Sequence, residues 1–159
     1  MKNFEQKLYS VLSNLCGILI FVMTILIFTQ VVCRYVMHNS LTWSEELGRY
    51  LFVWITFVGL PVALKAGAHV AIDLLLKKTK GRFHIAILTI NAVATAILGI
   101  VIFYSGIRLV LLGVGQISSA MQLPMQYVYT IIPVSGLLLL FFTVTVYLEE
   151  RAKALQGDK

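Results

Sequence analysis

Charged residues are scarce in this sequence. Asp, Glu, Lys and Arg make up 13% of its 159 positions, well below the roughly 25% that is usual for a soluble domain, and hydrophobic residues make up 59%. These four charged residue types are missing altogether from residues 8–33, 50–64, 83–107 and 109–148. Since about 20 mostly apolar residues cross a bilayer, the gaps exclude an ordinary soluble domain and predict an all-α integral membrane protein.

Cysteine and histidine are also rare, which argues against redox and metal chemistry. Cys16 and Cys33 are separated by roughly 25 Å on one predicted helix, so they cannot pair with each other and are expected to be packing residues. His38, His69 and His84 lie near predicted span ends rather than at the shared depth that two haem ligands need. The sequence has no glycine-rich phosphate loop, zinc-type cluster or nucleophile motif. We therefore expect no cofactor, no metal and no catalytic site.

The longest uncharged stretch must be divided. Glycine and polar residues gather between Gly113 and Pro124, which predicts a loop there, with Pro124 opening the last helix. Pro61 and Pro133 fall inside spans and are expected to kink them. The predicted spans leave only short loops and tails, so residues 1–159 form a single membrane domain with four transmembrane helices: 10–33, 46–67, 84–113 and 125–148.

The basic residues predict the orientation of the chain, because basic loops stay in the cytoplasm. Most of them lie in the two tails and in the connection between the second and third spans: Lys2, Lys7, Lys77, Lys78, Lys80, Arg82, Arg151, Lys153 and Lys159. The other two connections carry little or no positive charge. Both termini are therefore expected to be cytoplasmic, and the net charge of +6 reflects topology and contact with anionic lipid rather than nucleic-acid binding.

Small residues recur along the third predicted span. Ala92, Gly99, Gly106 and Gly113 are spaced by seven, which makes a stripe where another helix can approach closely. That helix could belong to this chain or to a partner protein, and Gly59 is assigned the same packing role. Polar residues at mid-span are few, and we expect their side chains to bond within their own helices: Thr24, Thr56, Asn91, Thr95 and Ser135.

The densest group of charged and aromatic residues spans the first outer connection and the start of the second span: Arg34, Tyr35, Trp43, Glu45, Glu46, Arg49, Tyr50 and Trp54. On a helix Glu45 and Glu46 precede Arg49 by four and three positions, so an ion pair on one face is expected. The aromatic rings suit the headgroup zone of a membrane. This group is either an anchored helix start or an interaction surface.

A second motif lies at the cytoplasmic end of the second span. Lys65, His69 and Asp73 recur at every fourth position, with Gly67 between the first two, so a helix would place the three side chains on one face. Three leucines and a lysine pair follow at 74–78. This composition predicts an interfacial helical extension after the second span.

Taken in order, the motifs of the first half are Arg34-Tyr35, Trp43-x-Glu45-Glu46, Arg49, Trp54, Phe57-x-Gly59, Gly67-x-His69 and Asp73. Those of the last span are Leu123-Pro124, Tyr127, Pro133 and Gly136. This set resembles the small membrane subunit of tripartite ATP-independent periplasmic (TRAP) transporters, the DctQ-like family. The resemblance covers most of the chain, and it implies a multi-pass protein of the bacterial inner membrane that is not an enzyme.

The resemblance also implies partners. Such a subunit is a scaffold for a separate, larger membrane subunit that carries the sodium and substrate sites, and it works with a periplasmic substrate-binding protein that delivers an organic acid, such as sialic acid or a C4-dicarboxylate. The outer region 34–50 and the loop 116–124 are then expected to lie near the docking surface for the binding protein or to pair with the large subunit. Membrane lipid is the remaining expected partner.

Two other functions remain consistent with the sequence. Trp, Tyr and His residues at span ends suit a quinone headgroup, so the chain could be the membrane anchor of a quinone-linked redox enzyme. A homo-oligomeric channel is the other possibility, although the sequence offers no polar stripe that would line a pore.

Overall fold

The computed structural model describes residues 2–38, 41–67 and 82–156, and its regular elements there are helices. They are α1 (Lys2–Tyr35), α2 (Thr42–Lys65), α4 (Arg82–Leu112), α5 (Met125–Tyr129) and α6 (Ile131–Gln156). Four stretches are long and apolar enough to cross a membrane, and each contains most of one predicted span: Asn3–Tyr35, Thr42–Lys65, Ile85–Leu112 and Met125–Ala152. The predicted all-α fold with four membrane-spanning helices is confirmed. The interfacial extension predicted after the second span lies outside the described residues.

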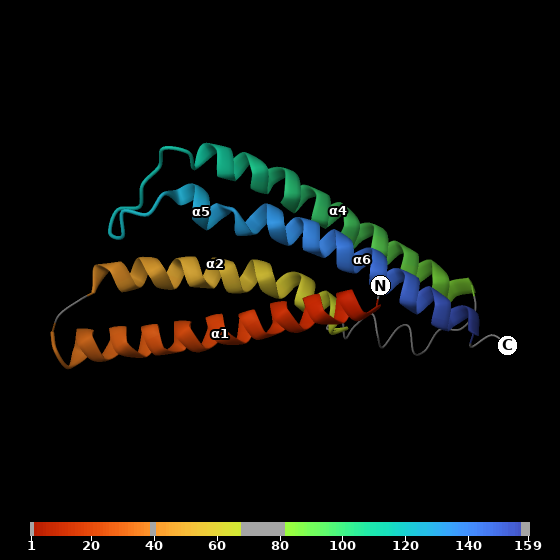
Figure 1. Ribbon diagram of the computed structural model, residues 1–159, viewed down its shortest axis with the longest axis horizontal. Coiled ribbons are helices and arrows are strands. Elements are labelled where there is room, and N and C mark those ends of the chain that lie inside the picture. Colours follow the sequence, from red (N-terminus) through yellow and green to blue (C-terminus); the bar gives the residue numbers. More distant parts are fainter. Residues whose placement is uncertain (1, 39–40, 68–81, 157–159) are drawn as a thin grey trace.

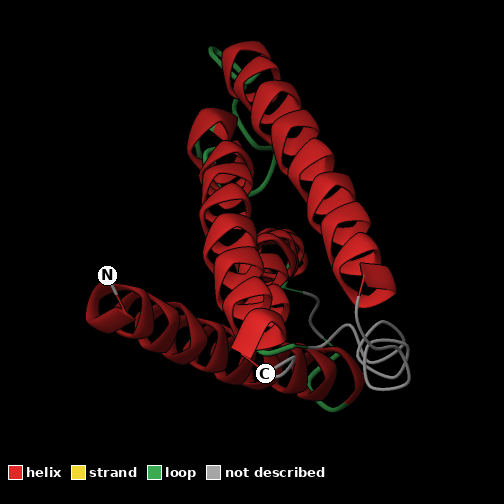
Figure 2. Cartoon of the chain, turned by 90° about the vertical axis from the view of Figure 1, so that its right-hand side faces the viewer, coloured by secondary structure: helices red, strands yellow, loops and turns green. Residues whose placement is uncertain are grey.

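The four long helices form an open row rather than a closed bundle. Helix α1 packs on α2, α2 packs on α6, and α6 packs on α4, and these are the extensive contacts between long helices in the described part of the chain. Figure 1 shows them side by side in the order α4, α6, α2, α1, with the start of α1 and the end of α6 at the same end of the molecule. Figure 2 shows that the axis of α1 diverges from those of α4 and α6. The row therefore consists of two hairpins, α1–α2 and α4–α6, joined where α2 meets α6.

The α4–α6 hairpin is built on glycine. A Cβ atom added at Gly106 would lie 2.6 Å from the backbone nitrogen of Pro133, and one added at Gly136 would lie 2.7 Å from the backbone nitrogen of Phe103. No larger residue fits at these two positions without moving a helix, because the two backbones are themselves in contact. Gly99 is less restricted, since the atom nearest to an added Cβ there belongs to the Leu140 side chain, at 2.9 Å.

The rest of the predicted small-residue stripe continues along the same hairpin. A Cβ added at Gly113 would lie 3.1 Å from the backbone nitrogen of Gln126 in α5, and Ala92 lines a small cavity between α4 and α6 together with Thr143. By contrast, a Cβ added at Gly59 would have no described atom within 4 Å, apart from the nearby backbone of its own helix and the neighbouring residues in the chain. Val58, one position earlier, is fully buried in the core, and the next position along a helix is turned about 100° away. Among the described residues, nothing fills the packing role predicted for Gly59.

The hydrophobic core extends from the start of α6 toward the end of the molecule where α1 begins. Leu12 and Cys16 of α1 pack there with Val58 and Leu64 of α2 and with Phe142 of α6. No residue of α1 between Cys16 and its end at Tyr35 is buried in the described structure. Helix α1 is thus held by its first half, while its second half touches α2 along one stripe and leaves its other sides open.

The two mid-span prolines act differently. Helix α2 continues through Pro61, whereas the last span is divided at Thr130, where α5 ends and α6 begins. Pro133 cannot donate to the carbonyl of Tyr129, which is four residues earlier, so the helix is weakened at this break. Pro124 is the N-cap residue of α5, so the helix itself begins at Met125, where the last span was predicted to start.

Candidate functional site

The carboxylate of Glu46 holds the loop that connects α4 to α5. Glu46 lies in the second turn of α2 and is only 5% exposed. One of its carboxylate oxygens accepts hydrogen bonds from the backbone N–H groups of Ala120 and Met121, both at 2.9 Å, and the other accepts one from the Tyr50 hydroxyl. Backbone amides that converge on a carboxylate form strong, charge-assisted bonds. Glu46 therefore fixes the loop against the start of α2.

This loop is also bonded to itself. The Ser118 N–H donates to the carbonyl of Leu123 at 2.9 Å, and the Leu123 N–H donates to the Ser118 hydroxyl at 3.1 Å. The Met125 N–H donates to the carbonyl of Gln116 at 3.0 Å. Gln122 turns the chain with a φ of 57°, which is uncommon for a residue other than glycine. Glu46 thus binds a preformed loop of defined shape.

The predicted ion pair between Arg49 and its neighbouring glutamates is wrong. Glu45 instead lies 3.7 Å from Arg34 of α1, and both side chains are about half exposed, so the pair contributes little energy. Glu46 is turned inward to the loop. Within the described residues no carboxylate lies within 4.0 Å of the exposed Arg49 side chain.

The aromatic residues of the outer group divide between two environments. Tyr35 is 72% and Trp43 is 44% exposed at the end of α1 and the start of α2. Trp54 lies twelve residues into α2, about 18 Å along the helix from its start. Its indole N–H donates to the carbonyl of Val128 in α5 at 3.2 Å.

The sequence predicted that Ser135 bonds within its own helix, but its hydroxyl bonds to another helix. Thr24, Thr56 and Thr95 bond to carbonyls of their own helices, as predicted. The fully buried Ser135 hydroxyl instead donates to the carbonyl of Phe57 in α2 at 2.6 Å. Phe57 is four residues before Pro61, so the proline has removed the N–H that would normally bond to this carbonyl. A hydroxyl from α6 replaces the missing donor.

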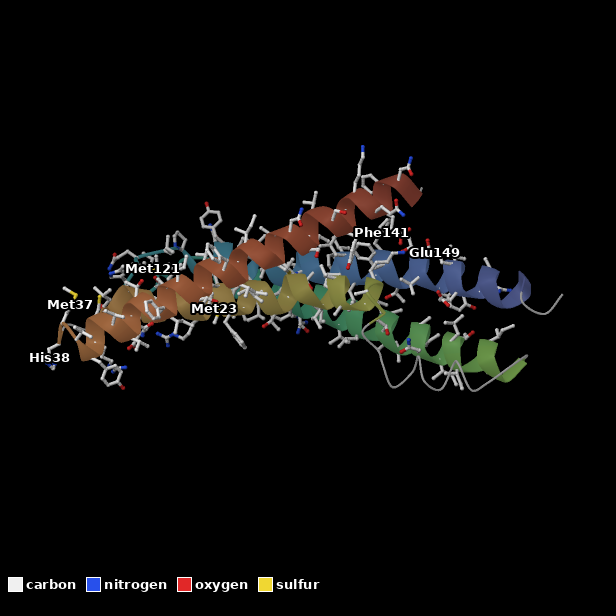
Figure 3. All side chains as sticks on the ribbon, turned by 90° about the horizontal axis from the view of Figure 1, so that it is seen from below. Met23, Met37, His38, Met121, Phe141 and Glu149 are labelled. Atoms are coloured by element: carbon white, nitrogen blue, oxygen red, sulfur yellow. The ribbon has the colours of Figure 1, made fainter. Side chains whose placement is uncertain are left out.

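At the opposite end of α2, Lys65 joins three helices. Its ammonium group pairs with Glu5 of α1 and with Glu149 of α6, the latter at 2.8 Å. Lys65 and Glu5 are largely buried, with side chains 17% and 6% exposed, and Glu149 is 33% exposed. Figure 3 shows Glu149 beside the first turns of α1, close to Phe141, whose ring packs edge-on against Phe4.

The motif predicted to place Lys65, His69 and Asp73 on one helical face lies only partly within the described residues. Gly67 lies just beyond the end of α2 with a φ of 71°, a conformation that favours glycine. His69 and Asp73 lie outside the described residues. The sequence analysis did not predict that Glu5 and Glu149 pair with Lys65. All three residues nevertheless fall at predicted span ends on one side of the membrane, where opposite charges tend to pair.

Together these contacts form what we call the α2 seam, the polar contacts that Glu46, Trp54, Phe57 and Lys65 make with the loop, α5 and α6. They occur about 6, 18, 22 and 34 Å along α2 from Thr42. Their chemistry is that of a structural joint, since each polar group is matched by a group on another segment. No group of three or more His, Cys, Asp or Glu side chains that could hold a metal ion occurs among the described residues.

Comparison with known proteins agrees with the motifs. The model of the family described as tripartite ATP-independent periplasmic transporters, DctQ component, matches residues 23–152. A putative TRAP transporter small permease protein of Haemophilus influenzae is 33% identical over 78 residues, which are 49% of this chain and 48% of that protein. The C4-dicarboxylate TRAP transporter small permease protein DctQ of Rhodobacter capsulatus is 33% identical over 106 residues, 64% of this chain and 46% of that protein.

A longer relative is similar over a smaller share of its length. The isethionate TRAP transporter permease protein DctMQ of Oleidesulfovibrio alaskensis is 30% identical over 95 residues, 58% of this chain but 15% of that protein. The chain thus spans about half the length of the two small permease relatives and much less of the longer one. The family model nevertheless covers all of α2, α4, α5 and most of α6. The chain belongs to the family of DctQ components of tripartite ATP-independent periplasmic transporters.

Proposed function

We propose that this chain is a scaffold subunit for a separate, larger membrane subunit that takes up an organic acid with sodium. The observation that carries this proposal is the open row of helices. Its polar groups are concentrated in the α2 seam, and its sides are apolar and uncovered over most of α1 and α4. Such a row can extend another membrane protein sideways, and it does not enclose a path for a solute.

The relatives support a division of labour between two subunits. The DctMQ relative is called a permease protein as a whole, and the similar region is a small part of it. We infer that the remainder corresponds to the transporting subunit, which this chain would meet as a separate protein. A periplasmic binding protein would deliver the substrate to the outer end, formed by Arg34, Trp43, Glu45, Arg49 and the loop that Glu46 holds.

The substrate class follows from the names of the relatives and stays a proposal for this chain. They include permeases for sialic acid, for C4-dicarboxylates and for isethionate, all of which are organic anions. We propose an organic acid of the sialic acid or C4-dicarboxylate type. Membership of the family supports a position in the bacterial inner membrane, and the distribution of basic residues supports both termini in the cytoplasm.

Isolation of the native complex tests the assembly directly. The chain would be tagged at its C-terminus, extracted gently from its own membrane and analysed by mass spectrometry for proteins that accompany it. We expect one larger polytopic protein at near-equal stoichiometry. Recovery of the chain alone, or with soluble redox subunits, would contradict the proposal and favour the channel or the quinone-linked anchor.

A pair of neighbouring variants tests the role of the outer end. Glu46→Ala frees the Ala120 and Met121 amides and releases the loop, so substrate uptake by the complete transporter should fall severalfold. Glu45→Ala removes the same charge one position away without releasing the loop, and its effect on uptake should be smaller. Normal uptake and normal complex recovery in both variants would exclude this end as a docking surface.

A further inference from the structure

A groove separates the outer halves of α1 and α2. It has a volume of about 670 Å³, within the range of roughly 300–1,000 Å³ that is typical of small-molecule sites. Met23 and Ile27 of α1 and Phe52 of α2 line its apolar part, and Gln30, Glu45 and Arg49 line its polar part. Figure 3 labels Met23 part of the way along α1, where this helix crosses α2 in the view.

The polar and apolar parts are arranged by depth. Glu45 and Arg49 lie about 4 and 10 Å from the start of α2, and Phe52 lies about 15 Å from it. Side chains on a helix lean toward its N-terminus, so the Arg49 guanidinium reaches back toward the membrane surface. The groove therefore has its charges at headgroup depth and its apolar walls at the depth of the lipid chains.

Arg49 is the group in this groove that needs a partner. It is exposed, and no described carboxylate lies within 4.0 Å of it. An arginine at the edge of the hydrocarbon region is costly unless an anion or water meets it. Glu45 is the matching anion one helical turn away, and its distant, exposed contact with Arg34 at 3.7 Å leaves it able to bind a second cation.

We propose that the groove binds one membrane phospholipid with a zwitterionic ethanolamine headgroup. The phosphate lies on Arg49, the ammonium group lies on Glu45, and one acyl chain follows Met23, Ile27 and Phe52. A guanidinium binds phosphate oxygens in a bidentate manner, and the ammonium donates to a carboxylate, so both headgroup charges are matched. A bound lipid would fill the space between the half of α1 that lacks buried residues and α2. Glu45 and Arg49 also belong to the outer end proposed above, but lipid binding is measured on this chain alone and does not rest on the transporter role.

The test uses the full chain, purified in detergent and stripped of native lipid. It would be incubated with micelles that contain dioleoylphosphatidylethanolamine or dioleoylphosphatidylglycerol, and bound lipid would be counted by native mass spectrometry. We expect about one ethanolamine lipid per chain and weaker retention of the glycerol lipid. Arg49→Gln should lower the affinity for the ethanolamine lipid about tenfold, because one charge-assisted contact is lost. Glu45→Gln should reduce the preference for ethanolamine over glycerol.

Arg108→Gln is the matched control. Arg108 is also an exposed arginine near a helix end, but it lies on α4 and bonds to the hydroxyl of Tyr104 at 2.9 Å. Its loss should leave lipid retention unchanged. Equal retention in Arg49→Gln and Arg108→Gln, or a preference for the glycerol lipid, would overturn the proposal. So would a photo-crosslinker at position 52 that labels a protein in the native membrane instead of lipid, since a partner helix would then fill the groove.

Discussion

The two hairpins of this protein are assembled in different ways. In the α4–α6 hairpin glycines bring two backbones into contact, and Gly106 and Gly136 have no room for a methyl group. In the α1–α2 hairpin larger side chains hold the helices apart, a groove opens between their outer halves, and Gly59 has open space around it. The comparison indicates that one hairpin is a closed structural unit, whereas the other presents surface to lipid or to a partner.

The sharpest way to break this comparison is to add the same methyl group to both hairpins. Gly106→Ala places a Cβ against the backbone of Pro133, which cannot move aside without shifting α6, so we expect a loss of about 3 kcal/mol in the free energy of unfolding. Gly59→Ala, the matched control, should be neutral or slightly stabilising because alanine favours helix. Both would be measured by unfolding the chain in mixed micelles. Similar effects would mean that the hairpins pack alike.

The charged end of the α2 seam should give the next largest effect. Lys65→Met leaves Glu5 and Glu149 without their shared cation, and we expect a loss of about 2 kcal/mol. The value is below that of a fully buried pair because Glu149 is one-third exposed. Adding Glu5→Gln to the variant should recover part of the loss, since it removes one of the two negative charges that Lys65 neutralised. A double variant that is less stable than Lys65→Met would show that charge pairing is not the reason.

The smallest expected change in the free energy of unfolding is at the middle of the α2 seam, where Ser135 meets Phe57. Ser135→Ala removes the donor that bonds to the carbonyl of Phe57, which should cost about 1 kcal/mol. In a Pro61→Ala background the helix regains its own N–H for this carbonyl, so the same change should cost almost nothing. A double-mutant cycle on the free energy of unfolding measures this coupling. An equal cost in both backgrounds would refute the replacement of the helix donor by Ser135.

The sequence and the structure differ most over which polar groups meet. Arg49 and its neighbouring glutamates have the spacing of an ion pair, yet Glu46 bonds instead to Ala120 and Met121, more than seventy residues away. Backbone amides are present at every position, so nothing in the sequence marks these two. The Ser135 contact was easier to predict from the sequence, because a proline four residues after Phe57 implies that the Phe57 carbonyl lacks its helical donor.

By itself, the sequence determined the number of candidate membrane spans, roughly where they lie and which family the chain belongs to. These features depend on runs of apolar residues, on breaks at glycine and proline and on motifs in a fixed order, all of which are local. Spacing by seven also located the glycines of α4. Only the tertiary structure decided that the helices form an open row, that α6 rather than α4 lies beside α2, and that Lys65 joins Glu5 to Glu149. In a membrane every outer face is apolar, so hydrophobic pattern does not tell helix neighbours from lipid, and close packing and a few polar contacts choose the arrangement.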